Sequence, residues 1–250
     1  MRYFLDISYN GEAYHGWQVQ ENANTVQGEV NRALRLLLSQ EVKTIGSGRT
    51  DTGVHAIQQI AHLDTPLQLM DDFGYKLNAI LPSDISVNDV YRVKSEAHAR
   101  FDAISRTYIY KIHCKKEPFF HGRSYFFTRA LDLDCMNEAA GILCKYQDYQ
   151  CFSKVNTNFN HFLCTIQHAE WKLMNGQICF FVRANRFLRG MVRALVGTML
   201  EIGEHKKSIS EFIDIIESKD RKRAGRSVPP YGLYLVGVNY PPEILFTSKQ

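Results

Sequence analysis

A single aspartate, Asp51, lies in a loop whose composition suits catalysis. Residues 46–56 read GSGRTDTGVHA, so the carboxylate stands between two threonines and two residues after Arg49. Glycines permit positive φ and let a ligand or a second backbone segment come close. An ionised carboxylate can act as a nucleophile or as a general base, and a neighbouring arginine favours its charged form. We therefore take Asp51 and Arg49 as candidate catalytic residues, with an ordinary structural turn as the alternative.

Other kinds of site are poorly supported around this loop. Neither the G-x-x-x-x-G-K-[ST] pattern nor the G-x-G-x-x-G pattern occurs here, which disfavours a phosphate-binding loop. No second carboxylate lies near Asp51 in the sequence, so a two-carboxylate glycosidase mechanism has no visible support. The six cysteines contain no C-x-x-C pair, and the nine histidines form no ligand-spaced set with them. We predict reduced cysteines and no metal site, and His55 and His62 are more typical of packing than of metal binding.

Two residues of the second half of the chain are further candidates. Tyr108 lies in a strand pattern, where its ring either packs in the sheet or stacks on a nucleobase. Arg193 has apolar neighbours, and we expect it to be partly buried and paired with an anion, for which Asp51 is a candidate. Arg189 precedes Arg193 by four residues, which predicts that both share one helix face.

The distribution of positive charge is more informative than the net charge of +4. Basic residues gather in three clusters, which are either solvated surface or a surface for a polyanion such as RNA. The clusters are Arg183, Arg186, Arg189 and Arg193; Arg221, Lys222, Arg223 and Arg226; and Arg100, Arg106, Lys111, Lys115, Lys116, Arg123 and Arg129.

Hydrophobic periodicity and turn residues predict the elements that position these side chains. Predicted strands are 2–9, 41–45, 54–63, 85–93, 104–114, 162–173, 177–184 and 233–240, with a hairpin turn at Asn175-Gly176. Predicted helices are 25–40, 67–81, 133–146, 188–202 and 208–218, the first of them capped by Asn24 or Thr25 with Gln27 closing a capping box onto Asn24. No apolar run of 18 residues and no leader pattern are present, so we expect no membrane span, no secretory signal and a cytoplasmic location.

The predicted elements repeat in the order strand-helix-strand-strand-helix-strand, with one extra helix in the second copy. This order favours an α+β protein of two ferredoxin-like halves with mainly antiparallel sheets. We expect residues 1–103 to form an N-terminal half that carries the Asp51 loop, and residues 104–250 a C-terminal half that carries Tyr108 and Arg193. A central cleft between two such halves would be a natural active site.

Ordered segments along most of the chain resemble the TruA family of tRNA pseudouridine synthases. They are YHGWQVQ at 14–20, TVQGE at 25–29, SGRTDTGVHA at 47–56, QIAH at 59–62, LNAILP at 77–82, HARFDA at 98–103, RTYIY at 106–110, FL at 187–188 with MVR at 191–193, and PPYGL at 229–233. The resemblance implies the pseudouridine synthase fold, isomerisation of uridine in RNA, and action on positions 38, 39 and 40 of the tRNA anticodon arm. It also implies a homodimer that needs no cofactor.

The resemblance assigns roles to individual residues. Asp51 matches the catalytic aspartate, Arg49 an arginine linked to extruding the target base, and Tyr108 the tyrosine that packs against that base. Arg193 matches the basic residue paired with the aspartate, and Leu233 an apolar residue lining the pocket. We also expect substrate contacts from His55, Arg186 and Arg189.

Two alternatives stay open at this point. A pseudouridine synthase with another RNA target would show the same residues. A non-catalytic RNA-binding protein on the same scaffold would explain the basic clusters and Tyr108, although binding alone needs no carboxylate in an RNA cleft.

Overall fold

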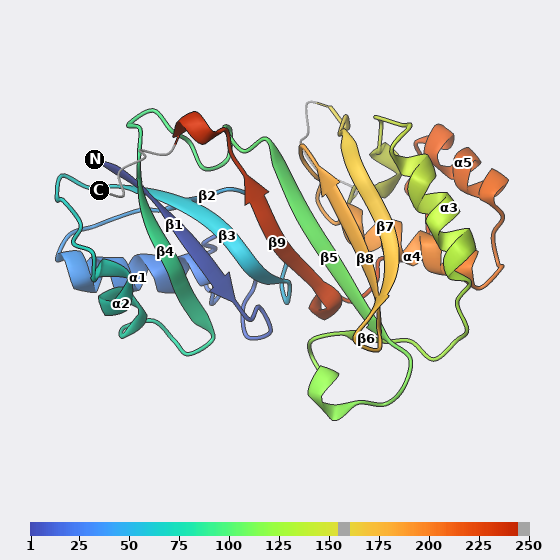
Figure 1. The fold of residues 1–250 in the computed structure, drawn as a ribbon, viewed down its shortest axis with the longest axis horizontal. Helices are drawn as coiled ribbons and strands as arrows, with labels where there is room; N and C mark the ends of the chain where they lie inside the picture. The colour runs from blue at the N-terminus through green and yellow to red at the C-terminus, as the bar shows by residue number, and fades with distance from the viewer. Residues whose placement is uncertain (155–160, 245–250) are drawn as a thin grey trace. The chain divides into compact units, whose positions relative to one another are not determined.

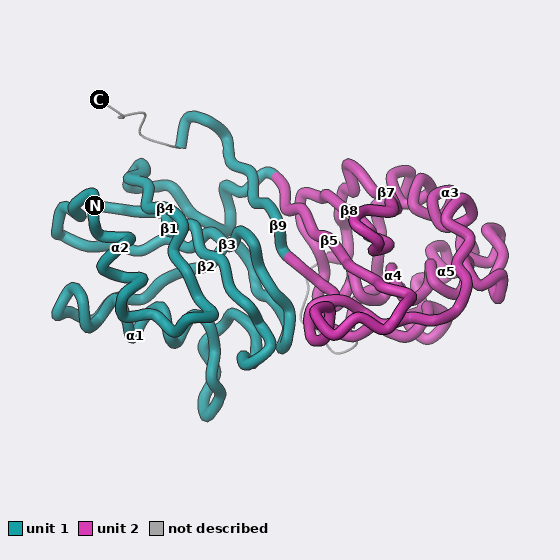
Figure 2. Tube along the Cα trace, turned by 60° about the horizontal axis from the view of Figure 1, so that its bottom comes forward, with its two compact units in different colours: residues 1–104, 235–250 teal, residues 105–234 magenta. Residues whose placement is uncertain are grey.

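The structure, a computed structural model, describes residues 1–154 and 161–244 (Figure 1). The chain divides into two compact units (Figure 2). Unit 1 contains Met1–Ile104 and the chain from Leu235 onward, and unit 2 contains Ser105–Tyr234. The split into domains at residues 103 and 104 stays a prediction, because compactness alone does not define an independently folding domain.

Unit 1 is an antiparallel sheet with two helices on one face (Figure 1). Strand β1 lies between β3 and β4, and β2 pairs with β3. Strand β9, Leu233–Asn239, also lies beside β3. Its elements are β1 Arg2–Tyr9, α1 Val26–Leu38, β2 Ile45–Gly46, β3 His55–Asp64, α2 Phe73–Asn78, β4 Ile85–Val93 and η4 Pro242–Ile244. Strand β1 is buried on both faces, because Phe4 on one side and Leu5 and Ile7 on the other are at most 2% exposed.

Unit 2 contains further strands of the same sheet and, among its described residues, three α-helices (Figure 1). Strand β8 lies between β5 and β7 with antiparallel pairing, and β6 runs parallel to β5. Its elements are β5 Ser105–His113, η1 Pro118–Phe120, β6 Tyr125–Phe126, α3 Leu133–Leu143, η2 Gln150–Phe152, β7 Ile166–Met174, β8 Gln177–Ala184, α4 Met191–Gly203, α5 Ile209–Ser218 and η3 Pro230–Gly232. Strand β9, Leu233–Asn239, begins in unit 2 and continues in unit 1.

The predicted α+β class with mainly antiparallel strands is confirmed, and so is the hairpin between β7 and β8. Asn175 and Gly176 both have positive φ, at 50° and 75°, which a two-residue turn of this kind requires. Within the described ranges 1–154 and 161–244, no helix combines the length and the apolar character needed to cross a membrane.

Two predicted elements are much shorter in the structure. The helix predicted at 67–81 begins only at Phe73, and the N–H groups of Leu67 and Leu69 before it donate to the hydroxyls of Thr65 and Tyr3. The strand predicted at 41–45 is reduced to β2. There the N–H of Thr44 donates to Asn31 and its carbonyl accepts from Gln27, so Thr44 is tied to α1.

The predicted capping box on α1 is wrong in one part. Thr25 caps the helix as expected, with its hydroxyl accepting from the N–H of Gly28 at 3.3 Å. Gln27 does not close the box, because its amide binds the carbonyl of Thr44 at 2.6 Å and accepts from Gln18 at 2.7 Å. The residue therefore joins α1 to the start of β2.

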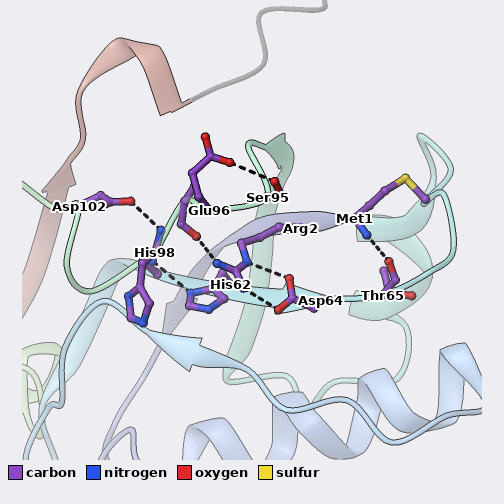
Figure 3. A network of polar contacts seen from close by, with 11 residues as sticks. Met1, Arg2, His62, Asp64, Thr65, Ser95, Glu96, His98 and Asp102 are labelled. Carbon is purple, nitrogen blue, oxygen red and sulfur yellow. Dashed lines mark hydrogen bonds and ion pairs between the residues drawn. The ribbon is translucent and has the colours of Figure 1, made fainter.

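A polar network joins β1, β3 and the segment after β4 within unit 1 (Figure 3). The guanidinium of Arg2 makes a two-pronged contact with the carboxylate of Asp64, at 2.8 and 2.7 Å. The N–H of Ala99 donates to Nδ1 of His62 at 3.1 Å, and the rings of His62 and His98 meet edge to face at 4.7 Å. Two segments of the family resemblance, 59–62 and 98–103, are thus in direct contact.

This network predicts a loss of stability in mild acid. Burial, with a smaller contribution from the charge of Arg2, lowers the pKa of His62 to about 4 from its ordinary 6.5. The unfolded chain therefore takes up a proton between about pH 6.5 and 4 that the folded chain does not, and stability falls as the pH falls through this window. We expect a loss on the order of 2 kcal/mol.

Urea unfolding of wild type and His62→Gln across this pH range measures the effect. Glutamine keeps an acceptor for the N–H of Ala99, and the curve of the variant should be flatter. His15→Gln, at an exposed histidine of the same unit, is the matched control and should follow wild type. An equally steep curve for His62→Gln would assign the acid sensitivity to other groups.

Candidate active site

Asp51 opens a tight turn in unit 1. The carbonyl of Asp51 accepts from the N–H of Val54 at 3.1 Å, and Gly53 has φ of +76°, a conformation that favours glycine. Asp51 is half-buried, whereas Arg49 and Thr52 on either side are exposed. The turn thus presents one carboxylate at the surface of the unit, with the arginine two residues away.

Strand β3 holds the start of this loop through one buried amide. The side chain of Gln59 has no exposed surface, accepts from the hydroxyl of Ser47, and donates to the carbonyl of Gly48 at 2.9 Å. The N–H of Ser47 also donates to the carbonyl of Ile60 at 2.7 Å. Because a buried amide is costly to leave unsatisfied, these contacts fix the backbone just before Arg49.

The segment 14–17 holds the other side of the loop, backbone against backbone. The N–H of Trp17 donates to the carbonyl of Thr50, and the N–H of Gly53 donates to the carbonyl of Tyr14. Gly16 has φ of +88°, and a Cβ there would lie 2.3 Å from the carbonyl oxygen of Thr50. Only glycine permits this approach, so the YHGW segment supports the Asp51 loop.

Aromatic rings complete this support. The hydroxyl of Tyr9 forms a 2.8 Å hydrogen bond with the hydroxyl of Thr50. The indole of Trp17 is 1% exposed and covers Gly46, where a Cβ would lie 2.4 Å from Nε1. The tryptophan therefore anchors its own segment against the loop, and Asp51 follows a stretch of backbone that is braced from both sides.

His55 lies at the start of β3 and is buried. Its Nδ1 accepts from the N–H of Gly11 at 3.0 Å, which connects β3 to the segment that follows β1. This contact gives His55 a part in holding the loop region. Its contact with substrate stays a prediction.

Unit 2 carries Tyr108 on β5, opposite Val182 of β8. The ring of Tyr108 is half-buried and meets the ring of Phe187 edge to face, with centroids 5.1 Å apart. The structure therefore brings Tyr108 and the FL segment at 187–188 together.

Arg186, just before this segment, is half-buried, and one of its terminal nitrogens lies 3.2 Å from Nε2 of His161.

Arg193 is half-buried in the first turn of α4, as expected. Its Nε donates to the carbonyl of Val228 at 2.7 Å, and the N–H of Val228 donates back to the carbonyl of Arg193. Tyr110 binds the next residue, donating its hydroxyl to the carbonyl of Pro229 at 2.8 Å. Burial raises the pKa of Tyr110, which keeps this hydroxyl protonated as a donor. Two side chains thus pin the 228–229 backbone.

Close backbone packing positions Leu233 at the end of the same segment. A Cβ at Gly197 of α4 would lie 1.8 Å from the carbonyl oxygen of Arg226, and one at Gly232 would lie 2.7 Å from the ring of Tyr110. Leu233 follows directly and is 6% exposed. The PPYGL segment is therefore held against α4 and β5.

One prediction about the arginines is wrong. Arg189 and Arg193 do not share a helix face, because α4 begins only at Met191, after Gly190 with φ of +72°. Arg189 is an exposed residue of the preceding loop, and its carbonyl accepts from the N–H of Lys154. The roles proposed for Arg49, Asp51, Tyr108, Arg193 and Leu233 stay predictions, with the first two residues on unit 1 and the other three on unit 2.

Several supporting residues had no role assigned from the sequence. They are Tyr9, Gly16, Gln59, Tyr110 and Gly197. A glutamine directly before the apolar pair Ile60-Ala61 of β3 is one signal that could have identified Gln59, because buried amides need partners. The glycines carry no such signal until the neighbouring backbone is known.

Comparison with known proteins identifies the class of protein that this fold and these segments define. The model of the tRNA pseudouridine synthase family matches residues 7–102 and 146–241. The chain is 47% identical over 245 residues to tRNA pseudouridine synthase A of Parabacteroides distasonis, covering 97% of both chains. It is 46% identical over 248 residues to the protein of that name from Porphyromonas gingivalis, covering 97% of this chain and 98% of the other.

These matches show that the chain belongs to the tRNA pseudouridine synthase family, whose members are isomerases. The resemblance carried by the ordered segments is therefore confirmed.

Proposed function

We propose that this enzyme isomerises uridine to pseudouridine at positions 38, 39 and 40 in the anticodon stem-loop of tRNA, with Asp51 as nucleophile or base. The observation that carries the proposal is the braced loop, which carries one half-buried carboxylate two residues after an exposed arginine. A protein that only bound RNA would gain nothing from a carboxylate held so firmly, because carboxylates repel phosphates. The family match over most of the chain supports the tRNA substrate.

The reaction breaks the bond between C1′ and the base nitrogen, turns the base, and joins C1′ to its C5 carbon. Asp51 starts it either by attacking C1′ or by removing the C2′ proton, and both routes fit one carboxylate. Arg49, exposed beside it, would help to take the base out of its stack. Tyr108 would pack against the extruded base and compensate for part of the unstacking energy.

The direct test uses tRNA transcripts labelled with tritium at C5 of uridine, because joining C5 to C1′ releases that hydrogen to water. We expect release from transcripts with uridine at 38, 39 or 40, and none when all three are replaced. Release from other RNAs alone would support a different target. Binding of tRNA without any release would support the non-catalytic alternative.

The cluster Arg221, Lys222, Arg223 and Arg226 offers a test of the RNA surface. Arg221 is engaged within its own loop, donating to the carbonyls of Ala224 and Gly225, so its replacement would disturb structure. Lys222 and Arg226 are exposed. We predict that the double variant Lys222→Gln, Arg226→Gln makes the fall of log affinity for tRNA with log salt less steep. The slope should become shallower by about 1 for each phosphate that the protein no longer neutralises.

Filter binding at several salt concentrations measures this slope. Lys43→Gln with Lys76→Gln, two basic residues of unit 1 outside the three clusters, is the matched charge control. An unchanged slope in the Lys222 and Arg226 variant would place the RNA on another surface.

Tyr108 offers a test of base packing. Tyr108→Phe keeps the ring and its edge-to-face contact with Phe187, whereas Tyr108→Ala removes both. Because stacking of a base on an aromatic ring contributes about 1–3 kcal/mol, we predict that alanine lowers turnover roughly 10- to 100-fold and phenylalanine much less. Equal losses in both variants would instead assign the role to the hydroxyl.

The proposal includes a homodimer in solution and a cytoplasmic enzyme that requires no cofactor, as the family resemblance implies. Sedimentation of the purified chain with and without tRNA tests the assembly state. Turnover after exhaustive dialysis against a chelator tests the absence of a metal requirement in the reaction.

A further inference from the structure

Three side chains of metal-binding type converge in unit 2, and none of them has a part in the proposed reaction. Asp132 and Cys135 stand at the start of α3, and His205 follows α4, which packs beside α3 (Figure 1). Oδ2 of Asp132 lies 3.3 Å from Sγ of Cys135 and 3.3 Å from Nε2 of His205. All three ligand atoms lie within 4.8 Å of one another.

The two separations of 3.3 Å are close to the edges of a tetrahedral zinc site. Zinc binds oxygen and nitrogen at about 2.0–2.2 Å and sulfur at about 2.3 Å, so a tetrahedral angle places two ligand atoms about 3.4–3.6 Å apart. An ion at the centre would take the place of the two hydrogens through which Oδ2 now contacts the thiol and the imidazole. The third pair, Sγ of Cys135 and Nε2 of His205, lies within 4.8 Å, and rotation of the exposed imidazole can bring it to the same spacing.

The backbone around the three residues is firmly held. The second oxygen of Asp132, Oδ1, accepts from the N–H groups of Asp134 and Cys135 at 3.0 and 3.1 Å and so caps α3. The N–H of Asp132 donates to the carbonyl of Gly203 at 2.9 Å. A Cβ at Gly203 would lie 2.5 Å from Sδ of Met136, so the end of α4 packs closely on α3. Such support orients metal ligands before the ion arrives.

Charge also fits a divalent ion. A carboxylate, a thiolate and a neutral imidazole together carry two negative charges, which balance the ion. The nearby cations of Arg129 and Lys206 are engaged by Glu204, at 2.7 and 3.1 Å. A mixed oxygen, nitrogen and sulfur set suits Zn²⁺ and disfavours Mg²⁺ and Ca²⁺, which prefer oxygen ligands.

We infer that Asp132, Cys135 and His205 form a binding site for a divalent transition-metal ion of the Zn²⁺ type, with water in the fourth position. The side chain of His205 is 67% exposed, so an ion and its water can enter from solvent. Binding releases the thiol proton of Cys135 to the solvent, and the remaining proton of the neutral His205 imidazole is then on Nδ1. The ion ties the first turn of α3 to the end of α4. The ion stabilises unit 2 and takes no part in RNA chemistry.

Titration of the reduced full-length chain with Co²⁺, the spectroscopic substitute for Zn²⁺, tests this site. We expect one ion per chain, a thiolate-to-cobalt charge-transfer band in the near ultraviolet, and loss of the band on adding Zn²⁺. Thermal unfolding should shift upward with Zn²⁺ concentration, because the ion binds the folded chain. None of these measurements uses RNA or turnover, so their outcome is independent of the proposed function.

Variants distinguish binding of Co²⁺ at this site from binding at the exposed thiols of other cysteines. Cys135→Ser should abolish the band, and His205→Gln should weaken Co²⁺ binding at least 10-fold. Asp132→Asn keeps the helix cap, since asparagine caps as well as aspartate, and should weaken binding in the same way. Cys114→Ser and Cys144→Ser, which remove exposed thiols elsewhere in unit 2, should leave the band unchanged.

The inference is overturned by the absence of a thiolate band in wild type. A band that persists in Cys135→Ser, or that disappears with Cys114→Ser or Cys144→Ser, would also overturn it. The inference would also be overturned if adding Zn²⁺ raised the unfolding temperature of His205→Gln as much as that of wild type.

Discussion

Asp51→Asn should lower turnover on tRNA on the order of 10⁴-fold while leaving tRNA binding and stability near wild type. Asparagine has nearly the same shape but can neither attack carbon nor accept a proton at neutral pH. The loop should stay in place, because Gln59, Tyr9 and the backbone of residues 14–17 hold it and the substitution changes none of these groups.

Single-turnover tritium release, filter binding and thermal unfolding measure the three quantities separately. Thr52→Ala, at the exposed neighbour in the same turn, is the matched control and should retain most of the activity. Turnover of Asp51→Asn near wild type would remove Asp51 from the mechanism. A large drop in unfolding temperature would instead assign the loss to the fold.

Arg193→Leu should lower turnover about 10²- to 10³-fold, because it removes a half-buried cation that we propose pairs with Asp51. Removing one partner of a buried pair costs about 3–5 kcal/mol. Arg193→Lys keeps the charge but loses the planar donor group, so it should recover part of the activity.

Arg193 also holds the carbonyl of Val228, and this second role needs its own control. Tyr110→Phe removes the neighbouring anchor at Pro229 without changing any charge. We expect it to lower stability by about 1 kcal/mol and to leave turnover largely intact. If Tyr110→Phe lowers turnover as much as Arg193→Leu, then Arg193 acts only by positioning the 228–233 segment. A crystal structure with Arg193 more than about 6 Å from Asp51 would exclude the pairing.

The sequence by itself determined the class of the fold and the family. Period-two strands, helical spacing and the Asn-Gly turn depend on local chemistry, because they report which side of each element is buried and which residues tolerate positive φ. The segments around Asp51, Tyr108 and Arg193 carry the family resemblance in linear order, so they needed no coordinates either.

Only the tertiary structure decided how these residues are held. Thr44 has strand-like neighbours, yet Asn31 and Gln27 of α1 take its backbone groups, and no local pattern reports a partner at that distance. The helix predicted from residue 67 starts only at Phe73, and the N–H groups of Leu67 and Leu69 bind the hydroxyls of Thr65 and Tyr3. Arg189 lies outside the helix because the left-handed backbone of Gly190 delays the start of α4.

The glycines and the metal-binding residues also depend on packing that the sequence does not report. Gly16 and Gly197 are ordinary glycines in the sequence, and their purpose appears only when another carbonyl lies where a Cβ would be. Asp132, Cys135 and His205 were not recognised as a set, because His205 is far from the other two in the chain. Packing of α3 against the end of α4 brings them together. Spacing in the sequence identifies metal ligands only when the ligands lie close together along the chain.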